Sequence, residues 1–197
     1  IALSADTGSS ATDFITKTAA QTVSGALSAA TASGDIVQVS LDNGSTWTTA
    51  THTAGQTTWS LAGQTLTASN TLQVRVTDAA GNSGTAATQA YVLDATAPAA
   101  PSVALTTDTG ASSTDTITSN GALTLSSAET GATVQYSTDG TNWTSSFTPA
   151  TGANSVQVRQ TDVAGNVSAA SAAYTFTLDT TAPTITITSI ALSADTG

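Results

Sequence analysis

Short runs in which apolar and polar residues alternate recur along the whole chain, separated by residues that favour turns. Such runs stand at residues 72–76 and again at residues 174–178. Alternation with a period of two is typical of strands that bury one face, and helical periodicity is hard to find. The pattern therefore predicts an all-β protein made of short strands.

The predicted strands form two similar series. They cover residues 22–27, 36–41, 46–49, 72–76 and 91–93 in the first series, and residues 102–105, 122–125, 133–138, 142–145, 156–158 and 174–178 in the second. Each series contains a tight turn, at Asp42-Asn43-Gly44 or at Asp139-Gly140, and Asp-Gly or Asn-Gly turns are a strong hairpin signal. About seven short strands with regular turns predict a tandem pair of immunoglobulin-like β-sandwich domains.

An internal repeat sets the domain organisation. Residues 6–16 match residues 108–118, and residues 74–82 match residues 158–166. A third copy begins at Thr184, and residues 190–197 repeat residues 1–8 letter for letter, which indicates a piece of a longer array. We expect domain 1 over residues 1–95, with its first strand clipped, and domain 2 over 96–180. A linker and the first strand of a third repeat follow over 181–197, with that strand at 184–192.

Two similar hexapeptides stand between the repeats: Leu93-Asp94-Ala95-Thr96-Ala97-Pro98 and Leu178-Asp179-Thr180-Thr181-Ala182-Pro183. Each one ends an alternating run and leads through a proline into the next, so we interpret them as interdomain linkers. The first repeat is also longer than the second, mostly between Trp47 and Asp78. This excess predicts an extra hairpin or a longer loop, which carries His52 and Trp59.

The charge balance narrows the classes of partner. Thirteen carboxylates stand against three basic side chains, for a formal net charge of −10. No basic patch can form, so nucleic acid is excluded as a partner, and binding to anionic membranes is disfavoured. The same excess of carboxylates favours cations. There is no cysteine for a disulfide, and no apolar run approaches the ~20 residues of a membrane span.

Four motifs occur in a fixed order in this chain. They are Asp-Thr-Gly-x-Ser-x-x-Asp-x-Ile-Thr, Asp-Gly-x-x-Trp, Thr-Asp-x-Ala-Gly-Asn and Leu-Asp-x-Thr-Ala-Pro. In this order they resemble the bacterial Ig-like repeats of giant cell-surface adhesins, of the calcium-dependent RTX type exported by type I secretion. The resemblance implies long arrays of such domains outside the cell, calcium at the joints, and an extender role that holds an adhesive tip away from the cell.

The sandwich topology brings acidic loops of two domains toward one linker. The predicted calcium ligands at the first junction are Asp6, Asp13 and Asp94 from domain 1 with Glu129, Asp162 and Asn166 from domain 2. So many carboxylates repel one another unless a cation joins them, and calcium accepts six to eight oxygen ligands. The alternative stays open that these residues only form turns, since Asp, Asn and Gly are ordinary turn formers.

The same residue types recur at the other two domain ends. At the second junction the predicted calcium ligands are Asp108, Asp115 and Asp179, without the loops of a following domain. Asp78, with Asn82 beside it, would face a preceding domain in the same way. We interpret Asp42 and Asp139 as hairpin-turn residues rather than ligands.

The aromatic residues and the single histidine give little support for other functions. Trp47 and Trp143 are expected to cover a sheet, whereas Trp59 is the better candidate for contact with a ligand. His52 stands alone, without a cysteine or a Ser-Asp set, and nothing else in the chain predicts an enzyme.

The prediction is therefore a non-enzymatic, monomeric stretch of extender repeats on the bacterial cell surface, whose partners are the neighbouring repeats. It would support cell adhesion or biofilm formation. The alternative is an Ig-like module that binds a glycan or a protein receptor through the insertion in domain 1.

Overall fold

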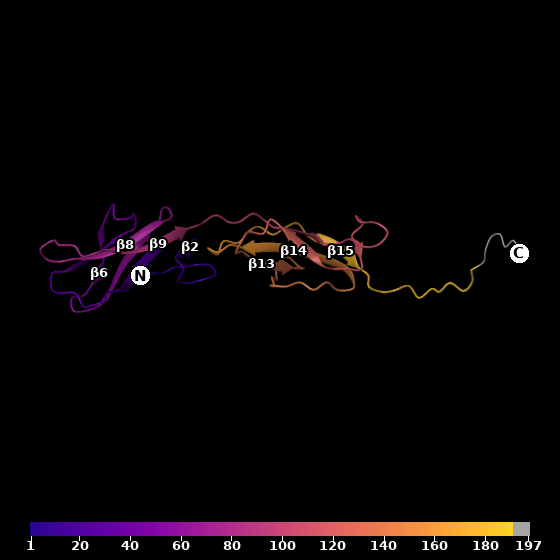
Figure 1. The fold of residues 1–197 in the computed structure, drawn as a ribbon, viewed down its shortest axis with the longest axis horizontal. Helices are drawn as coiled ribbons and strands as arrows, with labels where there is room; N and C mark the ends of the chain where they lie inside the picture. Colours follow the sequence, from indigo (N-terminus) through magenta and orange to yellow (C-terminus); the bar gives the residue numbers. More distant parts are fainter. Residues whose placement is uncertain (191–197) are drawn as a thin grey trace.

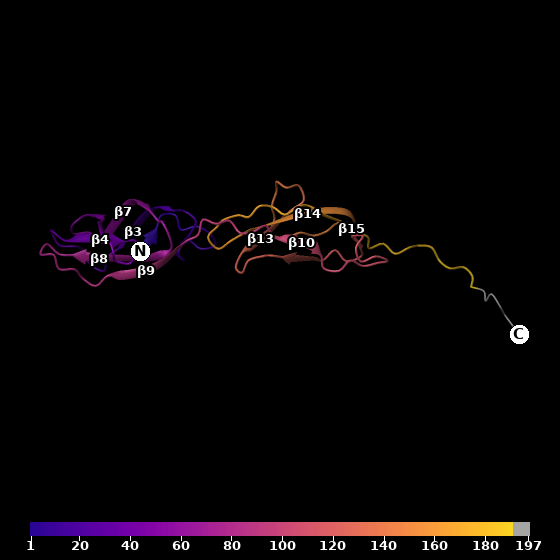
Figure 2. The same ribbon diagram turned by 90° about the horizontal axis from the view of Figure 1, so that it is seen from above.

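Two β-sandwiches lie one after the other along the long axis of the molecule, and a thin tail leaves the second one (Figure 1). The computed structural model describes residues 1–190 of the chain. A view turned by a right angle shows the same linear arrangement (Figure 2). All regular elements of the described part are strands, so the predicted all-β Ig-like class is confirmed. Within residues 1–190 there is no helix that could span a membrane.

Domain 1 packs two sheets against each other. One sheet has the order β1-β3-β7-β6, formed by β1 (Ala2–Leu3), β3 (Ala20–Ala26), β7 (Thr58–Thr65) and β6 (Thr51–His52). The other has the order β2-β9-β8-β4-β5, formed by β2 (Ile15–Thr16), β9 (Ala87–Leu93), β8 (Asn70–Thr77), β4 (Ile36–Ser40) and β5 (Thr48–Thr49). Alternating residues of the two sheets meet in the core, where Val23, Val37 and Leu72 are fully buried.

Domain 2 repeats this plan with fewer strands. Its sheets are β10-β12, formed by β10 (Ser102–Leu105) and β12 (Leu123–Ser126), and β11-β15-β14-β13, formed by β11 (Ile117–Thr118), β15 (Tyr174–Leu178), β14 (Gly152–Thr161) and β13 (Thr133–Ser137). A separate core forms around Val156, Val158 and Phe176. Residues 94–101 connect the two domains without a strand.

The insertion in domain 1 forms the predicted hairpin. Strand β6 pairs with β7 at His52 and Trp59, and β7 in turn pairs with β3 along most of its length. Domain 2 has no counterpart of β7. Its strand β12 therefore pairs on one side only, with β10, within the part of the chain that the structure describes.

Two predicted return strands are shorter than expected, and a third predicted strand does not form in the described residues. The return strand expected over 46–49 is reduced to β5, and the one over 142–145 is reduced to a single bridge between Tyr136 and Thr144. The strand expected over 184–192 does not form in residues 184–190, and residues 191–192 lie outside the described residues. A strand needs a partner, as β10 finds in β12 of its own repeat, and none of the strands in residues 1–190 pairs with residues 184–190.

Candidate functional site at the interdomain joint

The loop between β1 and β2 of domain 1, residues 4–14, faces domain 2 and is held in a defined shape. Asp6 accepts a hydrogen bond at Oδ2 from the Phe14 N–H at 3.0 Å. The Thr16 hydroxyl donates to the Ala5 carbonyl at 2.6 Å. Phe14 has a φ of 61°, a left-handed conformation that a bulky side chain adopts only at a cost. The strained backbone at Phe14 is therefore part of the loop conformation that places Asp6, Thr7 and Gly8 at the end of domain 1 facing domain 2.

The equivalent loop of domain 2 has the same construction. Thr116 donates its N–H to Asp108 Oδ2 at 2.9 Å, and its φ is 58°. The Thr118 hydroxyl donates to the Thr107 carbonyl at 3.2 Å. The two loops differ in sequence at several positions but have the same conformation. We therefore attribute that conformation to the residues they share, Asp-Thr-Gly and Asp-x-Ile-Thr.

The loop between β14 and β15 of domain 2 begins with a turn that closes on itself. Asp162 accepts the Asn166 N–H at Oδ1, at 2.8 Å, and the Asn166 side-chain amide at Oδ2, at 2.9 Å. Asp78 and Asn82 of domain 1 form the same two bonds at 2.8 and 2.9 Å. These bonds from Asn82, the side-chain amide first, hold the pKa of Asp78 below its usual value.

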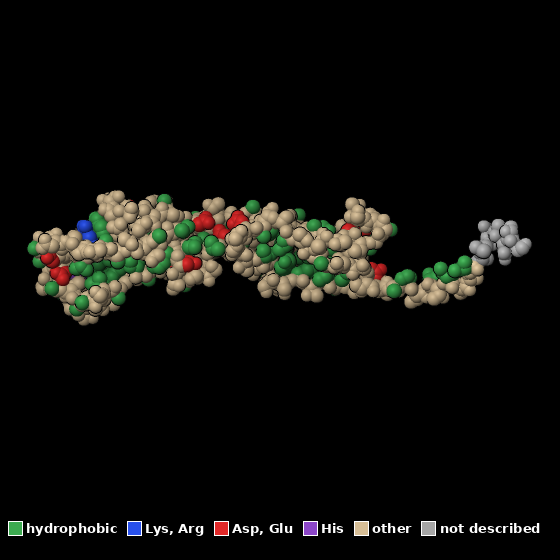
Figure 3. All heavy atoms as spheres, in the orientation of Figure 1, with side chains coloured by type: hydrophobic (Ala, Val, Ile, Leu, Met, Phe, Trp, Pro, Cys, Tyr) green, Lys and Arg blue, Asp and Glu red, His purple; other side chains and the backbone are tan. Residues whose placement is uncertain are grey.

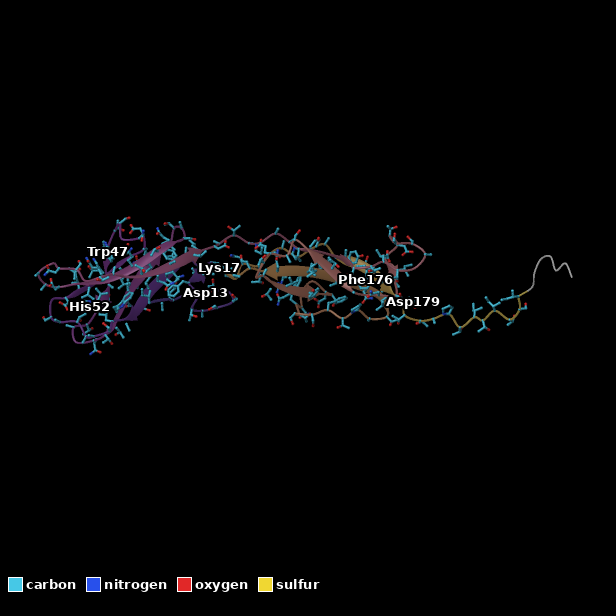
Figure 4. All side chains as sticks on the ribbon, viewed as in Figure 1. Asp13, Lys17, Trp47, His52, Phe176 and Asp179 are labelled. Atoms are coloured by element: carbon cyan, nitrogen blue, oxygen red, sulfur yellow. The ribbon has the colours of Figure 1, made fainter. Side chains whose placement is uncertain are left out.

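Hydrogen bonds join these two loops directly across the joint. Thr7 Oγ1 donates to the Ala164 carbonyl at 2.7 Å, and Lys17 Nζ donates to the Gly165 carbonyl at 2.6 Å. The Ser9 N–H donates to the Val163 carbonyl at 3.3 Å. In the opposite direction, the Asn166 side chain donates to the carbonyl of Asp94 in the linker at 2.8 Å. Three successive backbone carbonyls of domain 2 are thus held by domain 1. Figure 4 shows Lys17 at the end of domain 1 that meets domain 2.

Docking buries the turn of domain 2. Asp162 is 8% exposed and Asn166 is 9% exposed, whereas the equivalent Asp78 and Asn82 of domain 1 are exposed. The two turns have the same internal hydrogen bonds, so the difference in exposure comes from the neighbouring domain.

Gly8 makes the close approach possible. Its φ is +100°, and a Cβ atom on it would lie 1.9 Å from the Val163 carbonyl oxygen. A Cβ atom on Gly165 would lie 3.1 Å from the Gly8 Cα atom. The two backbones therefore touch at a pair of glycines, and no other residue type fits at position 8 without moving the domains apart.

The predicted calcium ligands lie on both sides of this contact, but they do not all come together. Asp94 contributes its backbone carbonyl to Asn166, and its side chain accepts the Thr96 N–H at 3.0 Å. Asp13 accepts the Ile15 N–H at 3.0 Å, and Glu129 is exposed. Within residues 1–190, no three His, Cys, Asp or Glu side chains are placed to hold a metal ion. The ligand set stays a prediction.

Among residues 1–190, two carboxylate oxygens are nevertheless buried without a hydrogen-bond partner. They are Oδ1 of Asp6 and Oδ1 of Asp108, at equivalent positions of the two repeats. A buried carboxylate oxygen that accepts no hydrogen bond is costly, and it is a chemically suitable ligand for calcium. Carboxylates also gather where the two domains meet (Figure 3).

The second junction repeats the half of the site that domain 1 contributes to the first. Asp115 accepts the Ile117 N–H at 3.0 Å, and Asp179 accepts the Thr181 N–H at 2.9 Å, like Asp13 and Asp94. Figure 4 shows Asp179 at the end of domain 2 from which the tail leaves. Ser119 stands where domain 1 has Lys17, so this end lacks the ammonium group.

Comparison with known proteins finds one family whose model matches the first repeat. Residues 1–95 match the bacterial Ig-like domain family. No curated protein matches the chain. Among solved structures, the chain is similar to one described as a biofilm-associated protein, BSP domain, with 19% sequence identity and a TM-score of 0.30. That match covers 86% of this chain and 29% of the other, so the chain spans under a third of that structure.

Trp59 and His52 of domain 1 have structural contacts. Trp59, predicted as the better candidate for ligand contact, is only 4% exposed and packs in the core against Gly25. The prediction was wrong because the sequence does not show that Trp59 lies on an inner strand, β7, with its side chain in the core. His52 bonds through Nε2 to the Asp35 carbonyl at 3.0 Å.

Trp47 and Trp143 cover a sheet, as predicted. The Arg75 guanidinium lies 3.9 Å from the centre of the Trp47 ring, and Arg159 lies 4.3 Å from the Trp143 ring. Each arginine also bonds to a glutamine of the neighbouring strand, at 3.0 Å for Arg75 and Gln38. Stacking of this kind stabilises an exposed sheet face and occupies the ring surface that a sugar would need.

Proposed function

We propose that the chain is a run of extender repeats from a bacterial surface adhesin, in which docked Ig-like domains form a stiff rod. The observation that supports it is the joint, where the turn of domain 2 is buried against domain 1. Independent modules on a flexible linker would leave both copies of that turn exposed. A rod of this kind suits a role outside the cell, where it holds an adhesive part away from the surface.

We further propose that calcium stiffens the joint. Asp6, Asp13 and Asp94 would hold the ion from domain 1, and Glu129, Asp162 and Asn166 from domain 2. The unpartnered Oδ1 atoms of Asp6 and Asp108 support this assignment. The ion would supply positive charge that offsets the repulsion among carboxylates. The acidic composition also fits the calcium-dependent RTX type, with export by type I secretion, and the partners of each repeat would be its neighbours.

Small-angle X-ray scattering tests both the stiff rod and its stiffening by calcium. We expect the full chain to be extended in calcium and to show a broader range of interdomain angles in a chelator. Asp6→Asn should remove most of the calcium response. Asp108→Asn is the matched control, because it alters the equivalent aspartate at the far end of domain 2 and should leave the first joint unchanged.

Two results would contradict the proposal in different ways. If the scattering is the same with calcium and with chelator, calcium does not act at this joint, although a direct lock would survive. If the two domains move independently in both conditions, the rod itself is wrong.

A further inference from the structure

Lys17 is the basic side chain that bonds across the joint between the two domains (Figure 4). Its Nζ atom donates to the Gly165 carbonyl of domain 2 at 2.6 Å. The other two basic side chains, Arg75 and Arg159, each stack on a tryptophan of their own domain. The chain has thirteen carboxylates and three basic side chains, and one of these three is therefore placed where the domains meet.

The backbone of Lys17 is fixed by the loop that docks on domain 2. The Lys17 N–H donates to Thr7 Oγ1 at 2.9 Å, and Thr7 Oγ1 itself donates to the Ala164 carbonyl at 2.7 Å. The lysine is thus anchored beside the docking contact. Only its flexible stem has to be ordered for the ammonium group to reach domain 2.

The second repeat has the same anchor with a different side chain. The Ser119 N–H donates to Thr109 Oγ1 at 2.7 Å, as the Lys17 N–H does to Thr7. The Ser119 hydroxyl lies 3.0 Å from Thr109 Oγ1, so it bonds within its own domain. A serine is short and uncharged. The two positions are therefore equivalent in backbone structure, but only lysine presents a positive charge to a neighbouring domain.

The ammonium group of Lys17 lies close to a buried carboxylate of the other domain. Lys17 and Asp162 line one hollow at the side of the joint, together with Thr7 and Ser9. Asp162 is buried there, and its oxygens accept hydrogen bonds from Asn166. A carboxylate held out of water is stabilised by a positive charge nearby. Lys17 therefore supplies, from within the chain, part of the positive charge that calcium would supply to this joint.

We propose that Lys17 is an internal cation of this joint, which keeps domains 1 and 2 docked in the absence of calcium. Where a neutral residue such as serine stands at this position, docking requires calcium. The inference rests on the proposed extender function and adds a rule to it: the residue after Asp-x-Ile-Thr decides how far a joint depends on calcium. In the parent chain, a chelator then broadens the interdomain angles without freeing the domains.

Distance distributions between two spin labels test the role of Lys17. The chain has no cysteine, so one cysteine introduced at an exposed position of each domain carries the label. In pulsed electron resonance, docked domains give a narrow distribution and independent domains give a broad one. In a chelator, we expect the narrow component to dominate in the parent chain. Lys17→Ser should lower the ratio of docked to undocked molecules roughly tenfold, because a charged hydrogen bond is lost, and calcium should restore the ratio.

Two further substitutions at the same position separate charge from hydrogen bonding. Lys17→Arg keeps the positive charge and the donors, so it should behave like the parent chain in the chelator. Lys17→Gln keeps a donor without the charge, so it should undock like Lys17→Ser. Lys17 is exposed, and none of these changes should unfold domain 1.

The outcomes distinguish this inference from the proposed function. If the parent chain undocks in the chelator, or if Lys17→Ser or Lys17→Gln stays docked there as fully as the parent, Lys17 is not an internal cation and the inference is wrong. If Lys17→Ser undocks and calcium does not restore docking, the role of Lys17 is supported, whereas calcium stiffening is contradicted both here and in the proposed function.

Discussion

At the scale of single residues, aspartate has two structural roles in this chain. Asp42 and Asp139 organise hairpin turns, as the sequence predicts, whereas Asp6 and Asp108 brace the loops at domain ends. The Asp42 carboxylate accepts the Thr46 N–H at 2.8 Å and the Thr46 hydroxyl at 2.6 Å. Its oxygens are satisfied, while Oδ1 of Asp6 is not. The buried, unpartnered oxygen therefore separates Asp6 and Asp108 from the hairpin-turn aspartates.

The first prediction concerns the acidity of Asp42. Hydrogen bonds from the Thr46 side chain, then from its backbone and from Ser40, lower the pKa of Asp42 to about 2. A carboxyl group whose pKa falls on folding stabilises the fold above its unfolded pKa of 3.8, and this contribution is lost as pH falls toward 2. Carbon NMR titration should find this pKa. In Thr46→Val it should rise toward 3.8, and an unchanged value would show that Thr46 is not the cause.

The second prediction concerns Trp59, which the structure places in the core rather than at a binding surface. Truncating a buried tryptophan removes its apolar contacts and leaves a cavity, so Trp59→Ala should destabilise domain 1 by about 3–5 kcal/mol. Denaturant unfolding followed by NMR signals of each domain would measure it. Trp143→Ala, at a half-buried surface position of domain 2, should cost less. A surface role for Trp59 would instead leave stability unchanged.

At the scale of the strand, the periodic pattern predicted the elements whose neighbours lie within the same repeat. Strands β4, β8 and β9 appear at the predicted places because their alternating residues face a core from the same repeat. The pattern failed in two ways. Residues 184–190 stayed without a strand and have no pairing strand in the described part of the chain, whereas residues 142–145 lie beside β13 but pair with it at Thr144 alone. Local sequence predicts the tendency to extend, but hydrogen bonding to another strand decides whether a strand forms.

The third prediction follows from the missing counterpart of β7. Strand β3 lies between β1 and β7, whereas β12 pairs only with β10 among the described strands. Edge strands open more easily than strands hydrogen-bonded on both sides. Amide hydrogen exchange should therefore be faster in β12 than at the residues of β3 that pair with β7. Equal protection in the two strands would indicate a further partner for β12.

At the scale of the whole molecule, the sequence predicted which loops meet at the joint but not how they hold together. The acidic side chains of these loops predict a metal site. The contacts that the structure shows are instead made largely by backbone carbonyls of residues 163–165, with Thr7, Ser9 and Lys17 as donors. Every residue has a carbonyl, so such contacts leave no mark on the sequence. The sequence signal for this contact is the glycine in two motifs, Gly8 in Asp-Thr-Gly and Gly165 in Ala-Gly-Asn, since glycine permits close backbone approach.

The fourth prediction concerns Gly8 and distinguishes its effect on the docking of the two domains from its effect on the stability of domain 1. Gly8 and Gly110 occupy equivalent positions with φ values of +100° and +113°, so alanine at either one should cost its own domain about 1–2 kcal/mol of backbone strain. Only Gly8→Ala also places a Cβ atom 1.9 Å from the Val163 oxygen, whereas at Gly110 the nearest atom, the Ile117 oxygen, is 3.8 Å away. Gly8→Ala should therefore push the domains apart.

Residual dipolar couplings of the two domains in a single alignment medium would report the difference. In the parent chain and in Gly110→Ala both domains should share one alignment tensor, because the joint fixes their orientation. In Gly8→Ala the tensors should differ, and the Asp162 and Asn166 amides should take on the exposed character of Asp78 and Asn82. If the two variants behave alike, backbone strain alone accounts for the effect of alanine, and the glycine contact does not lock the joint. If Gly8→Ala alone frees the domains, the rod depends on direct backbone docking, and calcium would act on a joint that is already formed.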